Sequence, residues 1–149
     1  MGVALDEPPL GYRLQNPKDA KSVMAALLSG GGVTWQGDPI FDADLPAGPD
    51  VELCVTDAPT AGNETRLVYH PQHYTLGLGC ARNADPDEMW THIEDVLTKN
   101  KIAHGAIACV ASIDLKADEP AIIQAAKRLS VPLRVFTADE LNAETARLA

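Results

Sequence analysis

The sequence predicts an α/β protein: a three-layer α/β/α domain with a largely parallel sheet over residues 73–149, preceded by a small α+β segment over residues 1–72. In the second half, β-prone apolar stretches alternate with helical patterns three times, which is typical of parallel strands joined by helices. In the first half, one helical pattern is followed by short β-prone stretches separated by Pro, Gly, Asp and Asn. These two patterns carry the prediction.

The first half begins with residues 1–15, which contain two prolines and no periodicity and are therefore predicted to be a loop. Asn16 is a good helix N-cap, Pro17 suits the first helical position, and apolar residues then recur at helical spacing as far as Gly30. The β-prone stretches that follow are VTW (33–35), VELCVT (51–56) and RLVYH (66–70).

The second half contains three strand-and-helix pairs in succession. The predicted strands cover residues 74–79, 105–112 and 133–136. The predicted helices begin at Asp85, Asp118 and Thr137, where a short polar side chain can accept a hydrogen bond from a free backbone amide. Strands that are nearly all apolar, such as GAIACVAS, are typical of a sheet covered on both faces.

The composition excludes several classes of function. With 12 Lys and Arg against 21 Asp and Glu, the formal net charge is −9, so we expect no nucleic-acid partner. No stretch has the length of a membrane span, and the N-terminus lacks the pattern of a signal peptide, so we expect no membrane association. Three cysteines without CxxC spacing indicate reduced thiols and a cytoplasmic protein.

The histidines indicate no metal site. No HxxxH or HExxH spacing is present, and His70 and His73, in the YHPQHY segment, are predicted to lie on the surface beside a turn. We therefore expect neither a bound metal nor a cofactor.

The segment GLGCARNAD follows the first strand of the second half. Gly77 and Gly79 would let the backbone approach another group closely, and the amides of the next helix together with Arg82 would favour an anion. The alternative is that the glycines only allow tight packing of strand against helix. Neither GxGxxG nor GxxxxGK[ST] is completed, so nucleotide binding lacks its usual support. Cys80 is interpreted as part of the wall of a site, not as a nucleophile.

A second polar loop, residues 112–119, follows the next strand. Lys116 could pair with a substrate carboxylate, and Asp114 or Glu119 could hold Lys116 in place or serve as a general base if desolvated. The alternative is a solvated turn followed by an N-cap, which we favour for Asp118. Because ligands of open parallel sheets bind at the carboxyl ends of the strands, the two loops are candidates for one site.

Taken together, GLGC-x-R, ASIDLKADE and FTADEL closely resemble the C-terminal domain of the CbiG/CobE family of cobalamin-biosynthesis proteins in order and spacing. The resemblance covers residues 76–141, and the first half is similar to the middle region of the longer CbiG proteins. Ala81-Arg82-Asn83 stands where the family usually has Arg-Arg-Gly, and Asn83 can still adopt the positive φ of a turn.

The resemblance implies binding of a precorrin or another corrinoid intermediate, a tetrapyrrole, and a possible association with other enzymes of corrin biosynthesis. Long family members open the ring-A lactone of cobalt-precorrin-5A with release of acetaldehyde, but their N-terminal domain is not found in this sequence. Three functions stay open: a hydrolase, a non-catalytic corrinoid carrier like CobE, and a generic phosphate-binding domain. No catalytic residue is assigned. The predicted substrate-binding residues are Gly77, Gly79, Cys80, Arg82, Asn83, Ser112, Asp114, Lys116 and Glu119.

Overall fold

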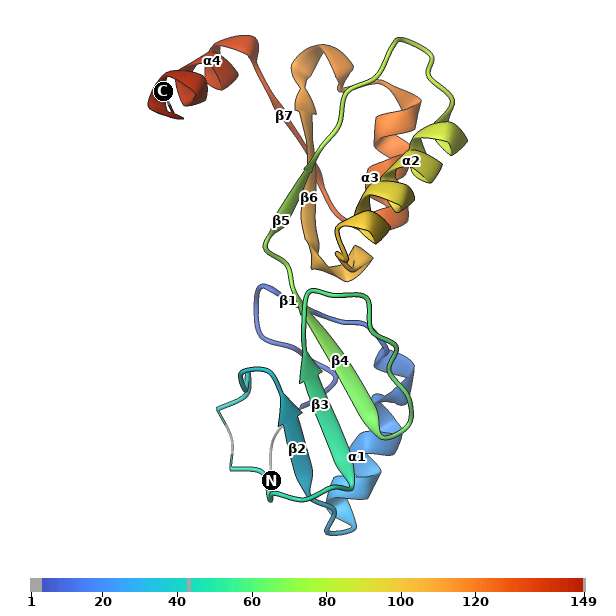
Figure 1. The fold of residues 1–149 in the computed structure, drawn as a ribbon, viewed down its shortest axis with the longest axis vertical. Coiled ribbons are helices and arrows are strands. Elements are labelled where there is room, and N and C mark those ends of the chain that lie inside the picture. The colour runs from blue at the N-terminus through green and yellow to red at the C-terminus, as the bar shows by residue number, and fades with distance from the viewer. Residues whose placement is uncertain (1–3, 43, 149) are drawn as a thin grey trace. The chain divides into compact units, whose positions relative to one another are not determined.

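The structure, a computed structural model, describes residues 4–42 and 44–148 (Figure 1). The chain forms two compact units: the first comprises residues up to His73 together with Lys101–Ala106, and the second comprises Tyr74–Asn100 and the residues from Ile107 onward. Each unit contains a sheet with parallel strands and at least one helix, so the predicted α/β class is confirmed. Within the described residues, no helix combines the length and apolar character needed to cross a membrane.

The first unit is built on a four-stranded sheet in the order β1-β4-β3-β2. Strands β2, β3 and β4 run parallel, and β1 pairs with β4 in the antiparallel sense. The elements are β1 (Tyr12–Leu14), the 3₁₀ helix η1 (Pro17–Asp19), α1 (Ala20–Leu28), β2 (Val33–Gln36), β3 (Val51–Val55), β4 (Arg66–Pro71) and the 3₁₀ helix η2 (His104–Ala106).

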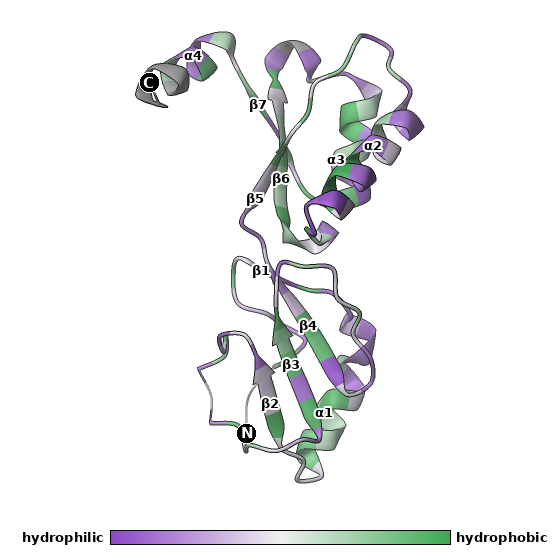
Figure 2. Cartoon of the chain, viewed as in Figure 1, coloured by the Kyte–Doolittle hydropathy of each residue, from purple (hydrophilic) through white to green (hydrophobic). Residues whose placement is uncertain are grey.

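The core of the first unit forms where α1 packs on the sheet. Val23 of α1 and Leu53, Leu67 and Tyr69 of the strands are fully buried. Figure 2 shows hydrophobic residues along β3, β4 and the C-terminal part of α1. Alternation along β3 places Val51 and Leu53 inward, as expected for a strand with one face on the core.

Two predictions for the N-terminal region are wrong. Residues 12–14 form a strand instead of a loop, and Leu5 is 1% exposed, so this region contributes to the core. Asn16 precedes η1, but its side chain does not cap the helix. It donates to the Arg66 carbonyl at 2.8 Å and accepts from the Val68 amide at 3.0 Å, because this 5% exposed residue lies beside β4.

The prediction that His70 lies on the surface is also wrong. His70 belongs to β4 and is 2% exposed. Its Nδ1 donates to the Thr56 carbonyl at 2.6 Å, and burial lowers the pKa of the imidazole. His73, three residues later, is exposed and lies 3.1 Å from an Asp57 oxygen.

The second unit is built on a three-stranded parallel sheet in the order β5-β6-β7. Its elements are β5 (Tyr74–Gly77), α2 (Pro86–Lys99), β6 (Ile107–Ile113), the 3₁₀ helix η3 (Asp114–Lys116), α3 (Pro120–Leu129), β7 (Leu133–Phe136) and α4 (Ala138–Leu148). Figure 1 shows α2 and α3 together on one side of this sheet. The buried residues of α3 are Ala121, Ile122, Ala125, Ala126 and Leu129.

Three predicted boundaries in the second unit shift, and the first is the end of β5, which lies at Gly77 instead of residue 79. Gly105 and Ala106 belong to η2, so β6 begins later than expected. Glu119, not Asp118, occupies the position before the first residue of α3, because Pro120 is the first helical residue. The capping role predicted for Asp85 is confirmed, since its side chain accepts from the Asp87 amide at 2.9 Å.

Candidate functional site

The predicted site residues lie at the carboxyl edge of the β5-β6-β7 sheet. Because β5 and β6 are parallel neighbours, the segments that follow them emerge at the same edge. The Leu78 amide donates to the Ala111 carbonyl at 2.9 Å, and Ser112 Oγ donates to the Leu78 carbonyl at 2.8 Å. The first end of the loop between β5 and α2, which we call the glycine loop (residues 78–85), is therefore tied to β6.

The second end of the glycine loop is held by Glu119, the residue before α3, and by a turn within the loop itself. The Asn83 amide donates to Glu119 Oε2 at 3.2 Å, and the Ala84 amide donates to the Ala81 carbonyl at 3.2 Å. Asn83 has a φ of +60°, a conformation that asparagine tolerates better than most residues. The loop thus runs between two fixed points, with Gly79–Arg82 between them.

The two glycines face open space. A Cβ added to Gly77 or to Gly79 would meet no atom within 4 Å, and neither residue has a positive φ. The alternative role considered for these glycines was tight packing of strand against helix. Such packing is not seen around them. By contrast, a Cβ on Gly32 would lie 2.5 Å from the Gly48 backbone, so packing within the chain does account for that glycine.

The charged groups of the site differ in exposure. The Arg82 side chain is 67% exposed, whereas its partner Glu119, with an oxygen 3.6 Å from the guanidinium, has only 3% of its side chain exposed. Asp114 is exposed and Lys116 is half-buried, both on η3. Within the described part of the chain, neither of their side chains makes a hydrogen bond or an ion pair. The side chain of Glu119 contacts the glycine loop, whereas its backbone amide donates to the Lys116 carbonyl at 3.1 Å.

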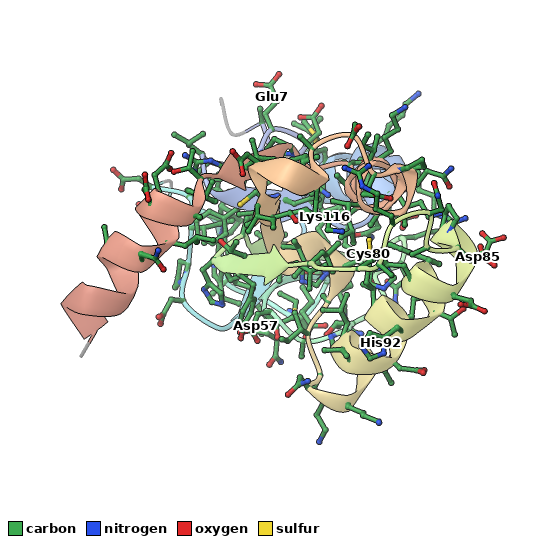
Figure 3. All side chains as sticks on the ribbon, turned by 90° about the horizontal axis from the view of Figure 1, so that it is seen from above. Glu7, Asp57, Cys80, Asp85, His92 and Lys116 are labelled. Atoms are coloured by element: carbon green, nitrogen blue, oxygen red, sulfur yellow. The ribbon has the colours of Figure 1, made fainter. Side chains whose placement is uncertain are left out.

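The predicted residues thus fall into four groups, of which the first is Asp114 and Lys116 on η3. Ser112 and Glu119 are buried and hold the glycine loop, while Gly77, Gly79, Arg82 and Asn83 are exposed on or beside it. Cys80 is half-buried within the loop. Figure 3 shows Cys80 on the loop and Lys116 on η3. Sequence reasoning missed the part played by Leu78, whose contribution comes from its backbone and leaves no mark in residue type.

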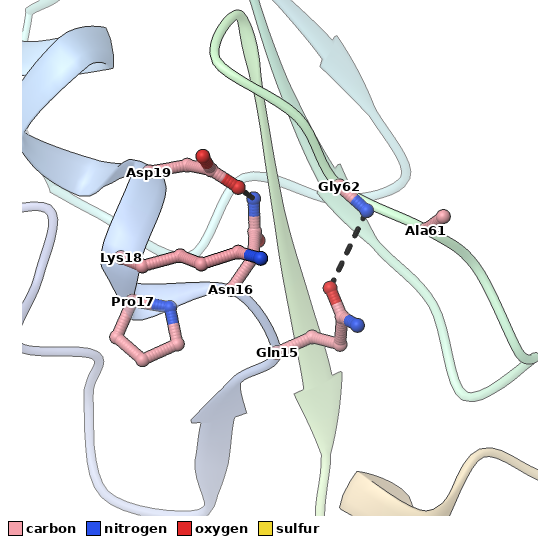
Figure 4. A pocket seen from close by; sticks show the side chains of 7 residues that line it. All are labelled: Gln15, Asn16, Pro17, Lys18, Asp19, Ala61 and Gly62. Atoms are coloured by element: carbon pink, nitrogen blue, oxygen red, sulfur yellow. Dashed lines mark hydrogen bonds between the residues drawn. The ribbon is translucent and has the colours of Figure 1, made fainter.

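A separate hollow of about 290 Å³ lies in the first unit, around η1 (Figure 4). Asn16 forms part of its wall and uses its amide on Asp19, Arg66 and Val68, so its polar atoms are engaged within the protein. The Gly62 amide donates to the Gln15 side chain at 3.3 Å across the same wall. Because these polar groups of the wall bond within the protein, the hollow is not taken as a ligand site. Among the described residues of the whole chain, no three His, Cys, Asp or Glu side chains gather where a metal ion could bind.

Residues 74–149, which span the glycine loop and η3, match the protein family described as Cobalamin synthesis G C-terminus. The chain belongs to this family. The resemblance found in the sequence motifs is confirmed by the match.

Two curated relatives are similar to part of this chain. Protein CobE from Sinorhizobium sp is 42% identical over 74 residues, which cover 50% of this chain and 48% of CobE. A cobalt-precorrin-5A hydrolase from Priestia megaterium is 26% identical over 103 residues, covering 66% of this chain and 28% of the hydrolase. The chain therefore spans half or less of the length of these relatives.

One solved structure is also similar. A putative cobalamin biosynthesis protein G homolog from Sulfolobus solfataricus aligns with 89% of this chain and 42% of its own, at 18% identity and a TM-score of 0.42.

Proposed function

We propose that the glycine loop and η3 bind the carboxylate-bearing side chains of a precorrin or another corrinoid intermediate. Membership of the Cobalamin synthesis G C-terminus family supports the ligand class. Precorrins carry several acetate and propionate arms, so their site needs fixed hydrogen-bond donors and cations. Arg82 and Lys116 supply cations, and the loop backbone supplies amides near the start of α2.

The single observation that carries the proposal is the open space at Gly77 and Gly79. These residues need neither a positive φ nor a close approach to any group of the chain itself. A ligand that lies directly against the backbone at these positions would explain why both residues are glycine. The loop is also held at both ends by Ser112 and Glu119, which limits the ordering that binding would require.

The net charge of −9 does not oppose this ligand at contact range. Screening reduces the interaction of exposed charges beyond about 8 Å at physiological ionic strength. The negative surface slows the approach of an anion, while Arg82 and Lys116 act on it once it is in place. The cytoplasm, where precorrin intermediates would be met, remains the expected location of the protein.

Gly79 provides the sharpest test. Gly79→Val should weaken binding of dicyanocobyrinic acid about tenfold or more, because the new side chain occupies the space above the loop. Its unfolding free energy should stay within about 1 kcal/mol of wild type, since a Cβ there meets nothing. Visible absorbance titration measures the affinity, and chemical denaturation measures the stability.

The matched control is Gly30→Ala. Gly30 has a φ of +96°, so the substitution should lower stability while leaving affinity unchanged. Arg82→Ala and Lys116→Ala should each lower the affinity for dicyanocobyrinic acid more than the affinity for dicyanocobinamide, because the arms of the second ligand are amides instead of carboxylates. A wild-type protein that gives no absorbance response at tens of micromolar corrinoid would refute the proposed function.

Hydrolysis of the bound corrinoid is the second candidate, and the presence of a carboxylate, Asp114, and a cation, Lys116, on the same short helix η3 favours it. Once a bound corrinoid has removed it from water, the carboxylate could act as general base while the cation stabilises the oxyanion. Incubation with cobalt-precorrin-5A separates the two functions: release of acetaldehyde indicates an enzyme, and binding without release indicates a carrier.

A further inference from the structure

Glu119 is a buried carboxylate whose position is unusual for its residue type. It precedes the first residue of α3, a position that Ser, Thr, Asp and Asn prefer because their short side chains bond to the helix amides. The Glu119 side chain makes no such bond to α3. The residue is nevertheless 2% exposed, and a carboxylate is rarely buried without a specific partner.

Among the described residues, the partners of the Glu119 side chain belong to the glycine loop. One carboxylate oxygen accepts from the Asn83 amide at 3.2 Å, and the other lies 3.6 Å from the Arg82 guanidinium. Asn83 has a φ of +60°, and the bond from its amide to Glu119 helps to hold the backbone in this turn conformation. Glu119 therefore holds the turn from the buried side of the loop, while the Arg82 side chain is largely exposed to solvent.

We propose that Glu119 is a positioning residue: its carboxylate fixes the glycine loop and orients Arg82 toward an anionic ligand without touching that ligand. The first part depends only on the contacts above, and the second part rests on the proposed function. An anionic ligand would repel a carboxylate that faced it, whereas burial beneath Arg82 keeps Glu119 away from the ligand side. Glu119 then differs in role from Gly79 and Arg82, which would meet the ligand directly.

The test compares Glu119→Ala with Glu119→Gln. Alanine removes the acceptor, so hydrogen exchange at the Asn83 amide should rise about tenfold in the ligand-free protein, and affinity for dicyanocobyrinic acid should fall about tenfold. Glutamine retains an acceptor oxygen at the same distance along the side chain. In Glu119→Gln, the exchange rate of the Asn83 amide and the affinity for dicyanocobyrinic acid should therefore stay within about threefold of wild type. Asp118→Ala, which removes the neighbouring exposed carboxylate, should change neither.

Glu119→Asp serves as the second variant if the alanine protein does not fold. It keeps the charge but is one methylene shorter, so it should behave like alanine in both measurements. Unchanged exchange at Asn83 in the alanine or aspartate variant, or a glutamine variant that fails to restore protection, overturns the inference. If wild type binds no corrinoid while the exchange pattern follows these expectations, the proposed function fails and the loop-positioning role of Glu119 stands.

Discussion

Tyr69 anchors the N-terminal segment of the first unit from inside the core. It is fully buried, and its hydroxyl donates to the Leu5 carbonyl at 2.6 Å. Its ring packs edge-on against Phe41, with 5.5 Å between the centroids. Burial raises the pKa of the phenol, so the hydroxyl keeps its proton and acts as a donor at every ordinary pH.

Tyr69→Phe should lower the free energy of unfolding by about 1–2 kcal/mol, because the Leu5 carbonyl is left without its donor in the core. Urea denaturation measures the change. Tyr12→Phe is the control: Tyr12 is only half-buried on β1, so its substitution should change stability by less than about 0.5 kcal/mol. Equal losses in the two variants would mean that the buried hydrogen bond makes no special contribution.

His70 makes the first unit sensitive to acid. Desolvation lowers the pKa of its imidazole below the usual 6.5, the Thr56 hydrogen bond and Asp57 oppose that shift, and Arg13 adds to it. Because the unfolded state binds the proton at a higher pH than the folded state, unfolding is favoured as the pH falls below about 6.5. The stability that neutral His70 supports is fully present only above this value.

The slope of unfolding free energy against pH, between 7.5 and 5.5, should therefore be steeper in wild type than in His70→Asn. One proton can contribute at most about 1.4 kcal/mol per pH unit. Asparagine can still donate to the Thr56 carbonyl but does not titrate in this range. His92→Asn removes an exposed histidine and should leave the slope as in wild type. Parallel slopes for His70→Asn and wild type would contradict the expectation.

At the scale of elements, α2 ends with an unfavourable backbone conformation. Its last residue is Lys99, and Lys101, two positions later, has a φ of +55°. This left-handed conformation after a helix is usually occupied by glycine, which has no Cβ to clash with the following carbonyl.

Lys101→Gly should raise the free energy of unfolding by about 0.5–1 kcal/mol for this reason. Lys99→Gly, placed inside the helix only two residues away, should lower it by about 1 kcal/mol. Changes of opposite sign in the free energy of unfolding of the two variants, measured by thermal or urea denaturation, would support the argument from backbone conformation. A loss of stability in both variants would contradict it.

Elements whose signals are local were predictable from sequence. Asp85 and Pro86 predict the start of α2, and the short β-prone stretch 133–136 after Pro132 predicts β7; both agree with the structure. The strand β1 was missed because three residues carry too little pattern, and its partner β4 lies more than fifty residues later. Asn16 was misassigned because the same amide that can cap a helix can also bond to a distant strand.

For the candidate site, the two loops selected from the sequence do lie at one edge of the sheet, but the roles of their residues differ from what residue type suggested. Gly77, Gly79 and Arg82 were predicted to face a ligand, and the structure leaves them exposed. Ser112 and Glu119 were grouped with them because their types suit a binding site. Their burial against the glycine loop depends on the spacing of β5, β6 and α3, which residue type does not reveal.

At the scale of the whole molecule, the family match and the compact units do not share all their boundaries. The match begins at residue 74, where the second unit also begins. Residues 101–106 lie inside the matched range but belong to the first unit. There the Ala103 amide donates to the Asp57 carbonyl at 2.7 Å, and Ala106 is fully buried.

This return of residues 101–106 affects how the protein is made on the ribosome. The first unit cannot be completed when His73 has been synthesised, because its last piece comes only after α2. At about 5–20 residues per second, the nascent first unit waits roughly 2–7 s for that piece. During that interval His70 lacks the cover of Gly105, so part of the surface of β4 that is buried in the finished protein stays open to water in the growing chain.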